Sequence, residues 1–165
     1  MMKSHDLFSR MPPSVAVQLF TFLHDSEKPL YKATIDTIAK QRNVRPIFIE
    51  RKPAAERYVW MKDTLGRKQN IDVAAHLLQI WLVGAQSNLL CDFLDALGIS
   101  HDDNGTIEQL PPAPAKDALT KAIDACCAKH DPQVVAVYLN AFQALDENGW
   151  STLGELLAED SRLRL

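Results

Sequence analysis

Apolar residues recur at helical spacing along most of this chain. In the segment 12–23, Val15, Leu19 and Leu23 lie on one face of a helix. The same spacing predicts one helix passing through Ile123 and others over the segments 26–43, 53–66, 70–85, 87–98, 131–145 and 150–160. The pattern therefore predicts an all-α fold, a compact multi-helix bundle of packed helical hairpins with seven to nine helices.

The ends of these helices carry the usual residues. Asp131 followed by proline predicts a helix start, and Ser26 is expected to cap the helix that follows it. Gly98 predicts a helix end, with Ile99 placed to make the hydrophobic contact of a Schellman motif.

The length of 165 residues fits a single domain, which we expect to span 1–165. The one proline-rich stretch is 109–115, which contains Pro111, Pro112 and Pro114. A sub-division of the domain at this linker is the alternative.

Charge is distributed unevenly along the chain. The net charge is −3, but up to Lys68 there are 13 Lys and Arg residues against 7 Asp and Glu residues, and from Gln69 onward 5 against 14. The first part therefore has a balance of +6 and the second a balance of −9. Such a chain can meet an anionic partner with its basic half, or pair its basic and acidic surfaces with each other.

The segment 38–52, IAKQRNVRPIFIERK, resembles a helix–turn–helix. Asn43 would form the turn and Pro46 would open a recognition helix, while the basic excess of this half suits contact with phosphates. Two features oppose this interpretation. Arg42 takes a position that normally packs inward, and Pro53 leaves about two turns for the recognition helix.

Part of the same segment could instead form a strand. Residues 47–52 would then place Glu50 and Lys52 on one face, as in metal-dependent nucleases. No other strand is predicted to pair with it, and a lone strand is unstable.

The simplest interpretation is a short helical or extended connection that buries Ile47, Phe48 and Ile49. Its cationic side chains would then be solvated or paired with the acidic half. Trp and Arg are enriched at the residues that dominate protein interfaces, so cations near Trp60 are the candidates for binding a partner. The candidate partner-binding residues are Arg45, Arg51, Lys52, Arg57 and Trp60.

Three residues are weak candidates for a metal site. His76, His101 and Asp102 resemble the His and His-Asp elements of helical HD-type phosphohydrolases, which activate water on metal ions. However, the His-Asp pair follows a helix end rather than lying within a helix, and His76 on an apolar helix is more often a core histidine. A metal-dependent hydrolase is therefore the third hypothesis for function.

Two Asp-x-Asn-Gly segments, 102–105 and 146–149, resemble the middle of a calcium loop. The end positions of such a loop need carboxylates, but they fall on Ser100 and Pro111 in the first segment and begin with Ala144 in the second. A helix C-cap formed by Asn-Gly is expected at both segments.

No cofactor is expected, because the chain has no glycine-rich phosphate-binding motif and no nucleophile elbow. Three cysteines without metal spacing favour a reducing cytoplasmic location. The longest apolar run, VAAHLLQIWLVGA, is shorter than a membrane span and predicts a core helix.

The segments FLDALGI, RPIFIERKPAAERYVWM and GWSTLGELLAEDSRLRL resemble a group of bacterial hypothetical proteins with no assigned activity. The resemblance implies a bacterial, cytoplasmic, helical protein and transfers no catalytic residue. The first hypothesis is thus a non-enzymatic interaction or regulatory module that binds a protein partner or itself, with a basic N-terminal face and an acidic face around Asp102 and Asp103.

Overall fold

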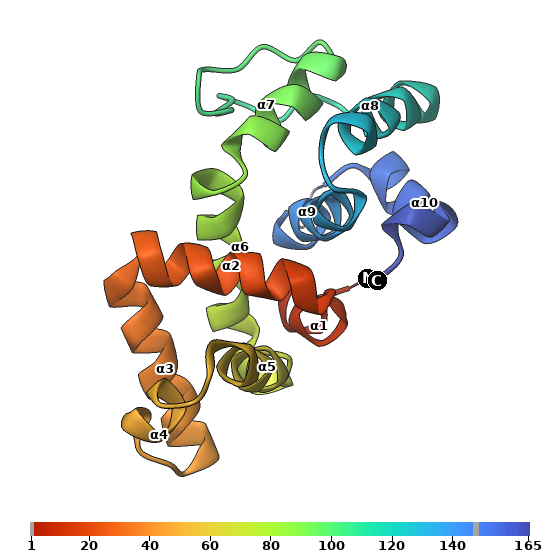
Figure 1. Ribbon diagram of the computed structural model, residues 1–165. Coiled ribbons are helices and arrows are strands. Elements are labelled where there is room, and N and C mark those ends of the chain that lie inside the picture. The colour runs from red at the N-terminus through yellow and green to blue at the C-terminus, as the bar shows by residue number, and fades with distance from the viewer. Residues whose placement is uncertain (1, 147–148) are drawn as a thin grey trace. The chain divides into compact units, whose positions relative to one another are not determined.

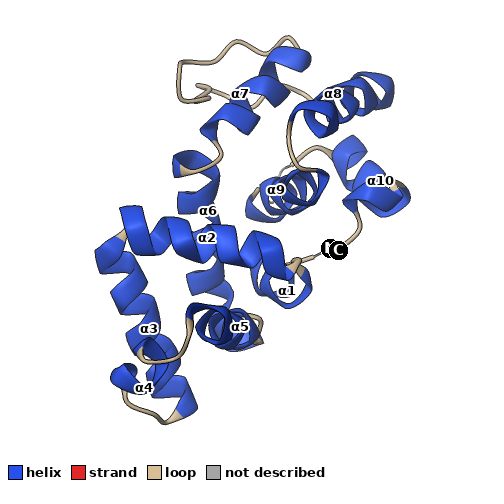
Figure 2. Ribbon diagram, in the orientation of Figure 1, coloured by secondary structure: helices blue, strands red, loops and turns tan. Residues whose placement is uncertain are grey.

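The computed structural model describes residues 2–146 and 149–165 (Figure 1). Every regular element in this described part is helical, with ten α-helices and two short 3-10 helices (Figure 2). The prediction of an all-α fold is confirmed. The apolar pattern did not predict the first helix, α1 (Ser4–Arg10), which contributes the buried side chains of Leu7 and Phe8.

Contacts divide the chain into two units, and the N-terminal unit is Lys3–Trp81. Within it, α5 packs against α1, α2 and α3, and the rings of Phe8 and Tyr58 each lie about 6 Å from that of Phe20, at 6.0 and 5.5 Å. Its elements after α1 are α2 (Pro13–Ser26), α3 (Lys28–Arg42), α4 (Pro46–Glu50), α5 (Ala54–Leu65), η1 (Lys68–Asn70) and most of α6 (Ile71–Gly84).

The C-terminal unit comprises Leu82–Leu165 together with Met2. Here α8 packs against α7, α9 and α10, and Phe93, Phe142 and Trp150 form an aromatic cluster. The elements that follow α6 are α7 (Ser87–Ala96), α8 (Lys116–Lys129), α9 (Pro132–Leu145), α10 (Ser151–Glu159) and η2 (Ser161–Leu163).

The expectation of one domain stays a prediction, because the division rests on contacts alone. The division falls inside α6, between Trp81 and Leu82, and not at the proline-rich segment 109–115. That segment lies within the C-terminal unit, where the indole N–H of Trp150 donates a hydrogen bond to the carbonyl oxygen of Pro111 at 2.9 Å. The prolines therefore belong to the packing of this unit.

Two of the three expected helix ends are confirmed. The Asp131 side chain accepts a hydrogen bond from the backbone N–H of Gln133, and Gly98 has a φ of 71°, with the Ile99 N–H bonded back to Leu94. The prediction for Ser26 is wrong, because α2 continues through that residue and its side chain caps no helix.

No single helix in the described part of the chain is long and apolar enough to cross a membrane. The bent pair Lys68–Gly84 and Ser87–Ala96 meets the length and composition requirement only when the two segments are taken together.

Candidate interaction site

α4 is a short helix held between two longer helices of the N-terminal unit. α3 ends at Arg42 because Asn43 adopts the left-handed conformation, with a φ of 55°. Pro46 then occupies the first position of α4, where its missing N–H removes no helical hydrogen bond. Since Pro53 precedes α5, α4 has only five residues, a length of about 7–8 Å.

The three apolar side chains of α4 do not share one environment. Ile49 is fully buried, whereas Ile47 is 47% exposed and Phe48 is 49% exposed. The expectation that the connection buries all three is therefore wrong for Ile47 and Phe48. Successive residues on a helix point about 100° apart, so one turn bracketed by prolines cannot direct three of them into one core. This is the signal by which the two exposed residues could have been predicted.

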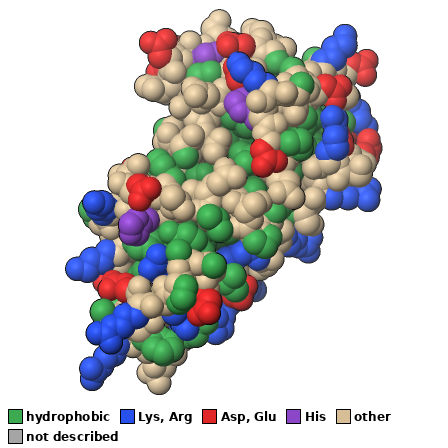
Figure 3. All heavy atoms as spheres, in the orientation of Figure 1, with side chains coloured by type: hydrophobic (Ala, Val, Ile, Leu, Met, Phe, Trp, Pro, Cys, Tyr) green, Lys and Arg blue, Asp and Glu red, His purple; other side chains and the backbone are tan. Residues whose placement is uncertain are grey.

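Cationic side chains surround the exposed apolar ones. Ile47 and Phe48 line a hollow of about 560 Å³ together with Val44, Arg45, Arg51 and Lys52. Figure 3 shows apolar side chains gathered with Lys and Arg side chains over α3 and α4. We define the α4 patch as these six residues together with Trp60 of α5, whose ring contacts Phe48 and Lys52, and Arg42 of α3, which packs on Trp60. Its members are Arg42, Val44, Arg45, Ile47, Phe48, Arg51, Lys52 and Trp60.

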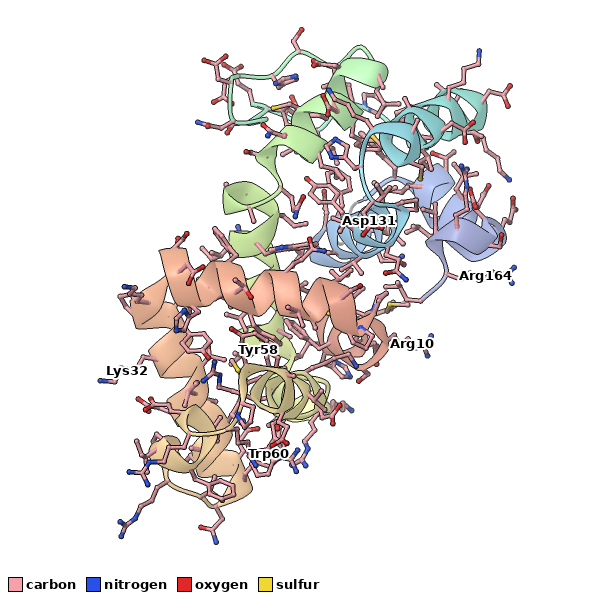
Figure 4. All side chains as sticks on the ribbon, viewed as in Figure 1. Arg10, Lys32, Tyr58, Trp60, Asp131 and Arg164 are labelled. Carbon is pink, nitrogen blue, oxygen red and sulfur yellow. The ribbon has the colours of Figure 1, made fainter. Side chains whose placement is uncertain are left out.

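Trp60 extends the patch from α5 (Figure 4). Its ring lies 5.7 Å from that of Phe48 in an edge-to-face arrangement. The Lys52 ammonium lies over both rings, 4.6 Å from the centre of Phe48 and 4.5 Å from that of Trp60. Each such cation–π contact at a surface contributes about 0.5–1 kcal/mol, so the rings and the cation hold one another in place.

Arg42 supports the patch from the last turn of α3. Its guanidinium lies 4.7 Å from the Trp60 ring centre, and its Nε donates to the Thr64 hydroxyl at 2.9 Å. Arg42 occupies the position that would pack inward in a helix–turn–helix, and here its half-buried side chain packs on an aromatic ring.

A buried amide pair lies beside this contact. The Asn70 side chain exchanges hydrogen bonds with Gln41, at 2.6 and 2.8 Å, and also donates to the Thr64 carbonyl at 2.7 Å. Asn70 is 1% exposed, so these bonds satisfy a polar group that water cannot reach. They tie α3, α5 and η1 together behind the patch.

Arg57 is the one predicted partner-binding residue that lies outside the α4 patch. Its guanidinium donates to the carbonyl oxygen of Glu50 at 3.0 Å and lies 5.4 Å from the Tyr58 ring centre. Arg57 therefore holds the end of α4 against α5. The other four predicted residues, Arg45, Arg51, Lys52 and Trp60, all belong to the α4 patch.

The cations of the two units differ in their ion pairing. Among the described residues, no Lys or Arg side chain of the N-terminal unit lies within 4 Å of a carboxylate. In the C-terminal unit, Lys116, Lys129 and Arg162 all form ion pairs. The cations of the α4 patch therefore have no ion-pair partner within 4 Å among the described residues.

The segment 38–52 does not build the recognition helix of a helix–turn–helix. The second helix has five residues instead of about two full turns, and Arg51 and Lys52 follow its end. Glu50 and Lys52 do not form a nuclease strand, because residues 46–50 are helical.

The three metal candidates do not form a site. His76 is an exposed residue of the N-terminal unit and not a core histidine, whereas His101 and Asp102 belong to the C-terminal unit. His101 Nε2 pairs with Asp95 at 2.6 Å. Across the described residues, no three His, Cys, Asp or Glu side chains come together as metal ligands.

Asp102 shapes a turn of the backbone. Its carboxylate accepts hydrogen bonds from the N–H groups of Asn104 and Thr106, at 2.9 and 2.8 Å, and these bonds lower the pKa of the carboxyl. The helix C-cap expected at Asn104 and Gly105 is wrong, because α7 ends at Ala96 and these residues lie in a separate turn, closed by the Gly105 N–H donating to the carbonyl oxygen of Asp102 at 3.1 Å. The corresponding Asn148 of the second Asp-x-Asn-Gly segment lies outside the described residues.

A second hollow, of about 460 Å³, belongs to the C-terminal unit. Its lining carries no charged side chain, and its most polar members are Asn140 and Gln143. The side-chain amide of Asn140 donates hydrogen bonds to the carbonyl oxygens of Ala136 and Leu163. This hollow therefore offers a ligand far fewer distinguishing groups than the α4 patch does.

Comparison with protein-family models, curated proteins and solved structures found no match to this chain.

Proposed function

We propose that this chain is a non-enzymatic protein-interaction module and that the α4 patch is its recognition surface. The observation that carries the proposal is the exposure of about half of Ile47 and Phe48 beside cations that have no carboxylate partner among the described residues. Leaving two large apolar side chains in water on one short helix has a cost that burial against a partner would recover.

The composition of the patch suits a protein partner. Protein interfaces have an apolar centre with a polar rim, and they are enriched in aromatic residues and arginine. Here Phe48 and Trp60 supply the aromatic surface, and Arg45 and Arg51 line the hollow together with Phe48. Lys52 is already packed on both rings, so little side-chain freedom remains to be lost on binding.

Nucleic-acid binding is the second candidate, supported by the same cations, which have no ion-pair partner within 4 Å among the described residues. Binding of single strands relies on bases stacking on free aromatic faces. In the α4 patch, cations lie over these rings, Lys52 over Phe48 and both Lys52 and Arg42 over Trp60. Ile47, which also lines the hollow, offers no aromatic surface for stacking. These contacts favour the protein partner.

We place the protein in a bacterial cytoplasm as part of the same proposal. Its three cysteines are free thiols, and Cys126 is buried. A reducing compartment suits this state.

Site-specific photo-crosslinking in cells tests the proposed function. Benzoylphenylalanine replaces Phe48, and in the control it replaces Val17, which is 44% exposed on α2. We expect position 48 to yield a discrete adduct that protease removes and nuclease does not. A nuclease-sensitive adduct would transfer the assignment to nucleic acid, and no adduct beyond that of the Val17 control would contradict the proposal.

A further inference from the structure

The charge of the N-terminal unit restricts the chemistry of its partner. Residues Lys3–Trp81 carry 13 Lys and Arg residues against 8 Asp and Glu residues, a balance of +5. Three of these cations, Arg45, Arg51 and Lys52, line the hollow of the α4 patch. A segment that buries this surface must supply negative charge, since burying unpaired cations is unfavourable.

The apolar centre adds a second requirement. Ile47 and Phe48 are about half exposed, so a purely acidic segment would cover them with polar groups and recover no apolar burial. A fitting partner therefore combines carboxylates with at least one large apolar side chain.

A cationic ligand is disfavoured by a contact within the patch. Aromatic pairs can bind ammonium groups of ligands, but here the Lys52 ammonium already lies within 4.6 Å of both ring centres. A second cation would meet Lys52 and Arg42 at the same rings.

A second copy of this chain is also a poorer fit. Its C-terminal unit supplies acidic side chains in the loop before α8, including Asp102, Asp103 and Glu108. Among the described residues, however, the only large apolar side chain of that unit that is about half exposed or more is Val83, which lies on a different element, α6. The acidic loop thus lacks a highly exposed apolar group to match Ile47 and Phe48.

We propose that the α4 patch binds a short acidic segment of another protein, an inference that rests on the proposed function. One large apolar side chain of that segment seats against Ile47 and Phe48. Its flanking carboxylates pair with Arg45, Arg51 and Lys52. Electrostatic attraction speeds association of the segment with the patch and fixes its alignment there. The apolar contact makes the patch prefer a mixed acidic–apolar sequence to a plain polyanion.

Selection from a random peptide display library on the immobilised full chain tests this inference without a known partner. We expect enriched peptides to combine Asp or Glu with an aromatic or large aliphatic residue. The leading peptide is then synthesised with a fluorescent label, and its affinity is measured by anisotropy against four variants of the chain.

Two variants alter the patch and two are matched controls. Lys52→Glu and Ile47→Ser are each expected to weaken binding roughly tenfold or more. Lys32→Glu makes the same charge change on α3, about 15 Å of helix before Arg42, and Lys32 projects outward there (Figure 4). Val17→Ser removes a similarly exposed apolar side chain from α2. Both controls are expected to change the affinity less than about twofold.

Several results would overturn the inference. They are enrichment of basic or purely apolar peptides, no enrichment over the bare matrix, and affinity unaffected by both patch variants. Self-association in sedimentation velocity that Lys52→Glu abolishes would make a second copy the occupant. If benzoylphenylalanine at position 48 crosslinks to a protein in cells but the selected peptides lack carboxylates, the proposed function stands and this inference fails. Displacement of the peptide by a single-stranded oligonucleotide would count against both.

Discussion

Replacing neighbouring residues of α4 by alanine tests whether the helix is oriented as described. Ile49 is fully buried, and truncation of a buried isoleucine to alanine costs about 2–5 kcal/mol. Because α4 is short and its other apolar side chains are about half exposed, the residues around Ile49 can relax after truncation. We therefore expect Ile49→Ala to lower the free energy of unfolding by about 2–3 kcal/mol, near the lower end of this range.

Ile47→Ala should lower the free energy of unfolding much less than Ile49→Ala does. Full burial of an isoleucine is worth about 1.5–3 kcal/mol, and Ile47 is 47% exposed, which leaves about 1 kcal/mol of burial to lose. Alanine recovers a few tenths of a kcal/mol through its higher helix propensity. The net expectation is a loss of about 0.5 kcal/mol in the free energy of unfolding, and the two variants should differ by about 1.5–2.5 kcal/mol.

Urea unfolding followed by far-UV circular dichroism measures this difference for the transition in which the N-terminal unit unfolds. Unchanged slopes in both variants would show that the midpoints report stability alone. Equal losses in the two variants, or a larger loss for Ile47→Ala, would show that α4 is turned differently. The α4 patch would then lack its apolar centre.

Three further predictions concern stability and reactivity. Asn70→Ala removes three buried hydrogen bonds and should cost about 2–3 kcal/mol in urea unfolding. Burial tends to raise the pKa of Asp92, but hydrogen bonds from His130 and Lys129 outweigh it and hold that pKa below its ordinary 3.8. The stabilisation is therefore present above that pH and is lost as pH falls through the folded-state pKa, so Asp92→Asn should flatten the acid-induced fall in thermal midpoint. Burial raises the pKa of Cys126 to about 11, so iodoacetamide should label this thiol at neutral pH only after unfolding, as mass spectrometry of the peptides would show.

The sequence predicts those features of the fold that depend on neighbouring residues. Asp131 caps its helix and Gly98 ends one because the interactions involved span only a few positions. The prediction for Ser26 was wrong because Ser26 is the last residue of α2 and the next residue, Glu27, takes the N-cap position of α3, a shift of one residue that no local signal settles.

Features that depend on tertiary packing were not predictable in the same way. The apolar run of α6 is continuous, so it does not reveal that the two units divide between Trp81 and Leu82. The composition of 38–52 indicated a basic surface, but the contact of Arg42 with Trp60 joins residues 18 positions apart and needs α3 and α5 packed together. The exposure of Phe48 likewise follows from which face of α4 meets the core.

The tryptophan indole signals in a proton–nitrogen correlation spectrum test the central claim most directly. The chain has three tryptophans, and only Trp60 belongs to the α4 patch, whereas Trp81 and Trp150 are buried. On titration with the selected acidic peptide, we expect the Trp60 signal to shift to saturation and the other two to stay in place. A Trp60 signal that does not move while the peptide binds, or that moves no more than those of Trp81 and Trp150, would contradict recognition by the α4 patch.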